Sequence, residues 1–242
     1  MCTVTFIPSN GKVFLSSNRD EKQWRKDAVK PTVYHYDSGK ILFPKDADAG
    51  GTWIAIHENG NAVVFLNGGR EKHTPHPPYR KSRGLILIDL IEGATPYNSF
   101  LAIKLVGIEP FTAIMWDDQH LFECRWDGIQ KYSLQLDEKL PHIWSSVTLY
   151  DEVVIKKRRN WFDVWIEQNS KPTQKQILHF HQFGGEGDCN NDFRMNREGK
   201  VFTVSVTSLA ISQQKATIKY LDLKNDDQSE ESITFEKIMA SR

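Results

Sequence analysis

Two stretches that favour β-structure begin the chain, and a strong turn signal separates them. "TVTFI" and "VFLSS" are rich in β-branched and apolar residues, and "NG" at positions 10 and 11 lies between them. Asn-Gly is the strongest short-range signal for a hairpin with a two-residue turn. In that register opposed residues have numbers that sum to 21, so Thr3 faces Asn18 and Cys2 faces Arg19.

The same pattern returns some 50 residues later. "TWIAI" and "AVVFL" flank a second "NG", at positions 59 and 60, and the second run ends in Asn67. With a two-residue turn, paired numbers sum to 119, which sets Thr52 opposite Asn67. The sequence therefore predicts two hairpins, each with an asparagine at the exit of its second strand.

The rest of the chain alternates between helical and strand patterns. "SRGLILIDLIEG" predicts a buried helix, and Thr95-Pro96 predicts the start of another. We expect strands over residues 111–116, 121–126, 129–134 and 200–211, and helices over residues 152–167, capped by Asp151, and 173–180. The charged run "KNDDQSEES" predicts a solvated turn near the end of the chain. This order favours one α+β domain over residues 1–242, with two sheets and helices on their outer faces.

Composition narrows the class of ligand. The chain has 31 basic and 31 acidic residues, a formal charge of zero and no Lys/Arg block, so neither nucleic acid nor an anionic membrane is indicated as a partner. No apolar run approaches the roughly 18 residues of a membrane span, and the first 15 residues lack the pattern of a secretory signal. We therefore expect a cytoplasmic protein that acts on a small molecule.

Cysteine usage points to reduced thiols and to one unusual position. Cys2, Cys124 and Cys189 are an odd number of cysteines without disulfide-like or zinc-like spacing. If the initiator methionine is removed, Cys2 carries both a thiol and a free α-amine. The ordinary pKa values of these groups are about 8.5 and about 7.7–8.0, so the amine can accept the thiol proton near neutral pH. Cys2 is therefore a candidate nucleophile, and Cys124, in a predicted strand, a core residue.

Other polar clusters give weaker signals. "HFHQFGGEGDCNND" brings His179, His181, Asp188 and Cys189 together, but no Cys-x-x-Cys or His-Glu-x-x-His motif accompanies them. The calcium-loop pattern fails as well, because Phe193 occupies the position that requires glycine. We expect neither a metal ion nor a cofactor.

Four ordered motifs carry a family resemblance. "MCTVTF" with "FLSSNRDE", then "GGTWIAIHENGNAVVFLN", then "SRGLILIDLI" resemble the NRDE family, also called the transport and Golgi organisation 2 family. That family is similar to cysteine-type N-terminal-nucleophile (Ntn) hydrolases such as penicillin V acylase and bile salt hydrolase. The resemblance implies a four-layer αββα sandwich of the Ntn-hydrolase type, with Cys2 at the end of a central strand.

The resemblance also assigns roles to residues. It implies that Cys2 is the nucleophile, that Arg19 and Asp20 hold the nucleophile and its amine, and that Asn67 helps to form the oxyanion hole. Glu21 is an alternative to Asp20, because the spacing differs from that of the acylases. Where the acylases have a further asparagine and a late arginine, this chain has Ser146 or Thr148, and Val204. The residues expected to contact substrate are Asn18, Glu21, Thr52, Ser146 and Thr148.

Two functions are consistent with this pattern. The first is hydrolysis of a linear amide or thioester by an N-terminal cysteine, through an acyl-enzyme. The alternative is a non-catalytic carrier or trafficking protein that holds a hydrophobic metabolite, such as haem or an acyl-CoA, in the same cleft. The residues that differ from the acylases motivate this alternative.

Overall fold

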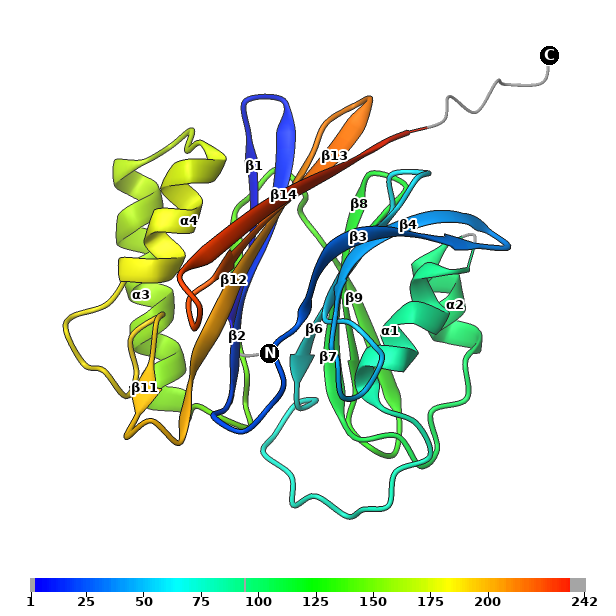
Figure 1. The fold of residues 1–242 in the computed structure, drawn as a ribbon, viewed down its shortest axis with the longest axis horizontal. Helices are drawn as coiled ribbons and strands as arrows, with labels where there is room; N and C mark the ends of the chain where they lie inside the picture. Colours follow the sequence, from blue (N-terminus) through cyan, green and yellow to red (C-terminus); the bar gives the residue numbers. More distant parts are fainter. Residues whose placement is uncertain (1–2, 94, 236–242) are drawn as a thin grey trace.

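The chain folds into four layers, with two β-sheets face to face and helices on both outer faces (Figure 1). The computed structural model describes residues 3–93 and 95–235. In this part of the chain each sheet has seven strands, and paired strands are antiparallel. This arrangement confirms the predicted α+β class and the αββα sandwich.

The first sheet has the strand order β10-β1-β2-β12-β13-β14, with the short β11 paired to β12. Helices α3 and α4 cover its outer face (Figure 1). The elements of this half are β1 (Thr3–Ser9), β2 (Lys12–Lys22), β10 (His142–Ser145), α3 (Glu152–Gln168), α4 (Gln174–Phe183), β11 (Asn196–Arg197), β12 (Val201–Ile211), β13 (Lys215–Asp222) and β14 (Asp227–Thr234).

The second sheet runs in chain order from β3 to β9. Helices α1 and α2 lie on its outer face (Figure 1). The elements of this half are β3 (Val29–Tyr36), β4 (Gly39–Lys45), β5 (Ile54–His57), β6 (Ala62–Asn67), α1 (Arg83–Ile91), α2 (Pro96–Ala102), β7 (Phe111–Asp117), β8 (His120–Trp126) and β9 (Lys131–Leu136).

Apolar side chains fill each of the three spaces between the layers. The central cluster joins the two sheets and includes Val4, Leu15 and Ile54. A second cluster packs the outer face of the second sheet against α1 and α2. A third packs the first sheet against α3 and α4 through residues such as Phe162 and Phe180. Burial of apolar area on both faces of both sheets is the main driving force for this layered arrangement.

The first hairpin has the predicted register. Thr3 pairs with Asn18, and the pairing continues to Ser9 with Lys12, beside the turn. Asn10 and Gly11 both have positive φ, as a type I′ turn requires. The predicted pair of Cys2 with Arg19 falls on a residue outside the described part of the chain.

The second hairpin differs from its prediction by one residue. Ile54 pairs with Val64 and Ile56 with Ala62, so paired numbers sum to 118 and Thr52 does not face Asn67. The loop contains three residues, because the backbone of Asn61 pairs with that of His57. Gly60 supplies the left-handed conformation that ends such a loop. Asn-Gly therefore marks the turn correctly, but the length of the loop sets the register.

Helix starts agree well with the sequence. Ser82 and Asp151 cap α1 and α3 through side-chain hydrogen bonds, and α2 begins at Pro96 after Thr95.

The charged run near the C-terminus differs from its prediction: only its first residues form the turn, and the rest belongs to the edge strand β14. β3 and β4 are strands that we did not predict.

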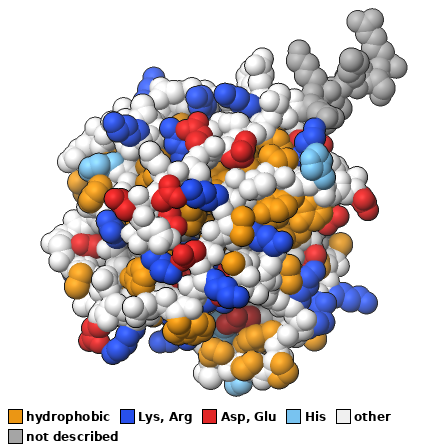
Figure 2. Space-filling model, in the orientation of Figure 1, with side chains coloured by type: hydrophobic (Ala, Val, Ile, Leu, Met, Phe, Trp, Pro, Cys, Tyr) orange, Lys and Arg blue, Asp and Glu red, His pale blue; other side chains and the backbone are white. Residues whose placement is uncertain are grey.

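The charged surface is mixed in sign on the face shown in Figure 2, where Lys and Arg side chains lie among Asp and Glu side chains. Among the described helices, none combines the length and apolar character needed to cross a membrane.

Side chains along β2 alternate between the two faces of the first sheet. Leu15 belongs to the cluster between the sheets, whereas Phe14 packs under the helices. Odd-numbered positions such as Arg19 therefore face the second sheet, and even-numbered positions such as Asn18 face α3 and α4. This alternation decides which of the predicted site residues lie together.

Candidate active site

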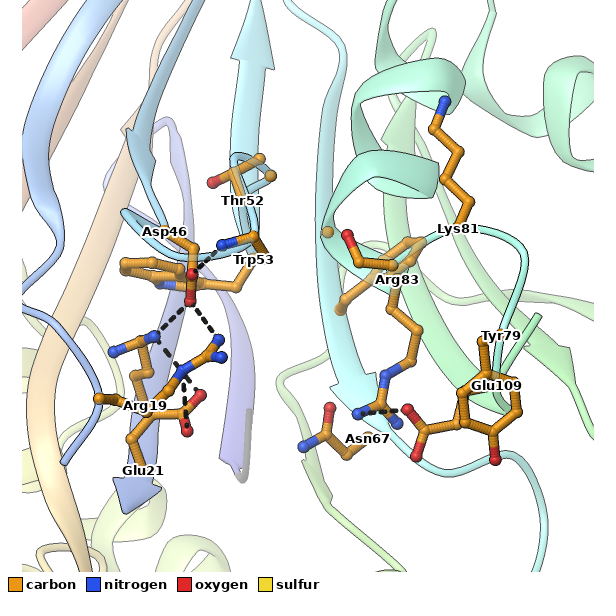
Figure 3. Close-up of a pocket in the computed structure, with 16 residues that line it drawn as sticks. Arg19, Glu21, Asp46, Thr52, Trp53, Asn67, Tyr79, Lys81, Arg83 and Glu109 are labelled. Atoms are coloured by element: carbon orange, nitrogen blue, oxygen red, sulfur yellow. Dashed lines mark hydrogen bonds and ion pairs between the residues drawn. The ribbon is translucent and has the colours of Figure 1, made fainter. Parts of the chain in front are cut away.

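A cleft of about 390 Å³ opens between the two sheets, where β2, β6 and the start of α1 converge (Figure 3). Its size is in the range of small-molecule sites. Seven charged residues line it, together with three aromatic residues and a carboxamide: Arg19, Glu21, Arg25, Asp46, Lys81, Arg83 and Glu109; Trp53, Phe65 and Tyr79; and Asn67. Ala49, Gly51, Thr52, Ser82 and Gly84 complete the lining.

Arg19 is fixed on one wall of the cleft by carboxylates. Its Nη2 lies 2.6 Å from Oδ2 of Asp46 and 3.4 Å from Oε1 of Glu21, and its guanidinium carbon is 4.7 Å from the centroid of a Trp53 ring. Nη2 of Arg25 also donates to Oδ2 of Asp46, at 2.7 Å. A buried guanidinium needs such partners, and they hold it in one orientation.

Asp46 joins the two arginines as a charged carboxylate. Burial alone would raise its pKa, but the backbone N–H of Ala49 and the guanidinium groups of Arg19 and Arg25 outweigh burial and hold the pKa below its ordinary value. Oδ1 accepts the backbone N–H groups of Asp48 and Ala49, which anchors the carboxylate to its loop. The arginine pair therefore stays oriented at neutral pH.

Asn67 lies at the end of β6 and points into the space between the Arg19 wall and Arg83 (Figure 3). Its backbone carbonyl accepts a hydrogen bond of 2.8 Å from Oγ of Ser146. Gly68 follows with φ +87°, and a Cβ there would lie only 2.6 Å from Val147. Glycine at position 68 thus lets the 146–148 loop pack closely behind Asn67. Its carboxamide makes no hydrogen bond to another described residue, so its N–H groups remain available.

The opposite wall is built around the start of α1. Arg83 reaches Oε2 of Glu109 at 3.1 Å and also donates to the carbonyl of Pro110. Gly84 accepts the backbone N–H of Thr52, and a Cβ at Gly51 would overlap the Gly84 backbone. The helix start and the loop before β5 are therefore in direct backbone contact.

The structure places the predicted site residues in three locations and leaves one residue undescribed. Arg19, Glu21, Thr52 and Asn67 line the cleft. The side chains of Asn18 and Asp20 face the helices on the other side of β2, and Ser146 and Thr148 lie behind Asn67. Cys2 lies outside the described residues. Of the two carboxylates that the sequence offers for this role, Glu21 and not Asp20 therefore shares the cleft with Arg19.

Thr52 has a structural role in the described arrangement. Its hydroxyl donates to the carbonyls of Pro44, at 2.6 Å, and Ile54, at 3.0 Å. These bonds join the end of β4 to the start of β5, so the hydroxyl is already engaged where it borders the cleft.

Asn18 belongs to a buried network under α4. Its Nδ2 donates to the carbonyls of His181 and Phe193, both at 2.9 Å, and its Oδ1 contacts Nδ1 of His181. The two donations from Nδ2 fix the orientation of the carboxamide, and its oxygen can only accept, so Nδ1 of His181 carries a proton. In the neutral ring Nε2 accepts from the hydroxyl of Thr5 at 2.8 Å. Both ring nitrogens of His181 are therefore engaged within the core, so neither is free to bind a metal ion.

His181 makes stability depend on pH. Burial, and then the positive charge of Arg158, lower its pKa from 6.5 to about 3. Between pH 3 and pH 6.5 the unfolded state binds a proton at His181 that the folded state does not. The contribution of the neutral His181 to the free energy of unfolding is therefore complete above pH 6.5 and is lost as the pH falls toward 3. We expect the unfolding free energy to fall by up to about 1.4 kcal/mol per pH unit from this group.

Urea denaturation between pH 7.5 and 4.5 measures this effect. His181→Gln should show a shallower pH dependence than the wild type, whereas His179→Gln, which changes an exposed histidine, should keep the wild-type slope. Equal slopes for all three proteins would show that His181 titrates normally in the folded state.

Cys124 is excluded as a nucleophile by its surroundings. It is fully buried in β8, and burial, followed by the charges of Glu123 and Asp117, raises the pKa of its thiol to about 12. The sequence-based expectation of a core residue is confirmed. Cys189 is exposed.

Several residues of the cleft were not predicted from the sequence. Asp46, Arg25, Arg83 and Glu109 come from loops and a helix start, and they meet Arg19 and Asn67 only through the packing of the two sheets. "KDADAG" after an apolar run is a local turn signal that marks Asp46, since its carboxylate caps the turn. No local sequence pattern indicates that Arg25, Arg83 or Glu109 would line the cleft.

Comparison with known proteins agrees with this architecture. The model of the family described as Transport and Golgi organisation 2 matches residues 1–183. No curated protein sequence matches the chain significantly.

Solved structures share the fold at low sequence identity. A mutant of conjugated bile acid hydrolase from Clostridium perfringens superposes with a TM-score of 0.64 and 10% identity, over 98% of this chain and 97% of the other. The Caenorhabditis elegans orthologue of N-acylethanolamine-hydrolyzing acid amidase gives a TM-score of 0.61 and 10% identity, over 86% and 92%. These likenesses show an Ntn-hydrolase fold. Since the family model covers most of the sequence, the chain belongs to the transport and Golgi organisation 2 family.

Proposed function

We propose that this protein is an N-terminal-cysteine hydrolase that cleaves a linear amide or thioester. The observation that carries the proposal is the shared cleft of Arg19, Glu21 and Asn67, which come from both sheets. The pairing of Thr3 with Asn18 brings the start of β1 beside Arg19. Along β1, Val4 and Phe6 face the second sheet, as strand alternation requires. The role of Cys2 at the start of this strand is part of the proposal.

The proposed reaction has two steps. The Cys2 thiolate attacks the carbonyl carbon, and the tetrahedral oxyanion receives an N–H from the Asn67 carboxamide. The bond from carbon to nitrogen or sulfur breaks, the leaving group takes the proton that the α-amine had accepted from the thiol, and an acyl-enzyme remains. Water then attacks the thioester with the amine as base, which releases the acid and restores the thiol.

Arg19 and Glu21 have complementary roles in this proposal. The guanidinium, held by Asp46, lies on the cleft wall and favours the thiolate over the thiol. The carboxylate of Glu21 is available to orient the α-amine. A thiol nucleophile must stay reduced, so the proposal includes a reducing compartment such as the cytoplasm.

The fold likeness supports acyl chemistry without naming a substrate. One similar structure is named as a hydrolase of conjugated bile acids and the other as an amidase that hydrolyses N-acylethanolamines. Both names describe hydrolysis, and the second describes cleavage of an amide. At 10% identity, neither substrate is transferred to this chain.

The test is mass spectrometry of the purified protein during incubation with acyl p-nitroanilides and acyl thioesters of increasing chain length. We expect the mass of a protein without Met1, and a transient acyl adduct on the N-terminal peptide that decays as product accumulates. Retained Met1, or stoichiometric binding without an adduct or product, would favour the carrier instead.

A further inference from the structure

Arg158 is a fully buried cation outside the cleft. It projects from α3 toward the first sheet, and its guanidinium donates in several directions at once. Nε donates to the carbonyl of Asn191 at 2.9 Å, and Nη2 donates to the carbonyl of Asp192 at 2.6 Å and to the hydroxyl of Tyr150 at 2.8 Å. Nη1 donates to Oγ1 of Thr3.

A buried guanidinium is costly unless its charge and its donors are matched. Asp20 is connected to this guanidinium through Tyr150: the tyrosine hydroxyl accepts from Arg158 and donates to Oδ2 of Asp20 at 2.9 Å. Oδ1 of Asp20 accepts from the hydroxyl of Thr203 at 2.6 Å. The network therefore joins α3, β2 and β12 in one chain of hydrogen bonds.

Thr3 is where this network meets the first strand. It is fully buried, it pairs with both Asn18 and Ser145, and it is covalently bonded to Cys2. A hydrophobic contact would cover Thr3 equally well, whereas a charged donor fixes the position and direction of its hydroxyl. The buried cation thus acts on the residue next to the proposed nucleophile.

We propose that Arg158 is a positioning residue, which acts through Thr3 and through Tyr150 and Asp20 to hold the start of β1 so that the Cys2 thiol is aligned for attack. This inference rests on the proposed function. It also gives Asp20, which faces away from the cleft, a role at the rear of the site.

The experiment compares matched threonine variants of the full chain. Thr3→Val removes the hydroxyl that Arg158 contacts, and Thr3→Ser keeps it. Thr5→Val is the control, because Thr5 is also fully buried on β1 but donates to His181. Tyr150→Phe breaks the link to Asp20 and tests the same network should Thr3→Val fail to fold. Intact mass first establishes that Met1 has been removed from each protein.

The readout is the rate of Cys2 alkylation by iodoacetamide between pH 5 and 9, together with kcat and KM for an acyl substrate. We expect Thr3→Val and Tyr150→Phe to lower the alkylation rate at pH 7 and kcat by about tenfold, through misplacement of the thiol. KM should change little. Thr3→Ser should restore the wild-type profile, and Thr5→Val should match the wild type although it loses a buried hydrogen bond.

The outcomes separate this inference from the proposed function. If Cys2 of the wild type is alkylated no faster than the exposed Cys189, it is not an activated nucleophile. That result would contradict both the proposed function and this inference. Fast Cys2 alkylation in the wild type and in folded Thr3→Val and Tyr150→Phe alike would overturn the inference alone. Equal losses in Thr3→Val and Thr5→Val would also overturn it, because they would report general loosening of β1.

Discussion

Replacing Cys2 by alanine is expected to lower kcat by at least about 10³-fold, the scale of loss for an enzyme without its nucleophile. Neither of the other cysteines can take its place. Cys124 is fully buried, and burial raises the pKa of its thiol to about 12. Cys189 is exposed and does not line the cleft. Initial rates with the best acyl substrate, measured for proteins of verified N-terminal mass, provide the measurement.

Cys189→Ala is the matched control, and it should retain wild-type turnover. Substrate affinity in Cys2→Ala, measured by calorimetry, should stay close to that of the wild type, because the alanine side chain leaves the cleft walls unchanged. Turnover in Cys2→Ala at the wild-type rate would exclude the acyl-enzyme mechanism. Tight binding without turnover in either protein would instead identify a carrier.

The two hairpins show what a local signal can predict. Both contain Asn-Gly, yet the first has a two-residue loop and the second a three-residue loop. In the first, Asn10 and Gly11 both have positive φ; in the second, Gly60 does and Asn59 does not. The dipeptide locates the turn, but it does not determine the length of the loop. A loop that is one residue longer gives every residue of the second strand a different partner on the first.

The site was only partly predictable for a related reason. The order of "NRDE" places Arg19 and Asp20 side by side in sequence, but adjacent residues of a strand point to opposite faces. Asp20 accordingly meets Thr203 and Tyr150, whereas Arg19 meets Asp46 across the gap between the sheets. Contacts of this kind join residues that are far apart in the sequence. They depend on how the strands and sheets assemble, which a local sequence pattern does not indicate.

Arg19 and Asn67 reach the same cleft by independent routes. Arg19 is placed by the first hairpin, whose register the sequence predicts, and is then held by Asp46. Asn67 ends a strand of the other sheet and is supported from behind by Ser146. Each is therefore fixed on a rigid element, and this is the preorganisation that the proposed electrostatic catalysis requires.

Replacing Asn67 by alanine is expected to lower kcat by about 10²–10³-fold, the range found when one oxyanion-hole donor is removed. KM should change much less, because the interaction forms with the oxyanion and not with the planar carbonyl. The free energy of unfolding should be nearly unchanged, since the carboxamide makes no hydrogen bond to another described residue. Steady-state kinetics and urea denaturation of the same preparations measure both effects.

Two further variants identify the physical origin of that loss. Asn67→Asp has nearly the same shape but replaces the N–H donor with a negative charge, so its kcat should fall at least as far as that of Asn67→Ala. Ser146→Ala removes the hydrogen bond to the Asn67 backbone carbonyl, together with the contacts of Ser146 to Thr148, and leaves the Asn67 carboxamide in place, so it should have a smaller effect on kcat. If Asn67→Ala raised KM tenfold and left kcat unchanged, Asn67 would bind the ground state, and the oxyanion hole would have to be formed by other groups.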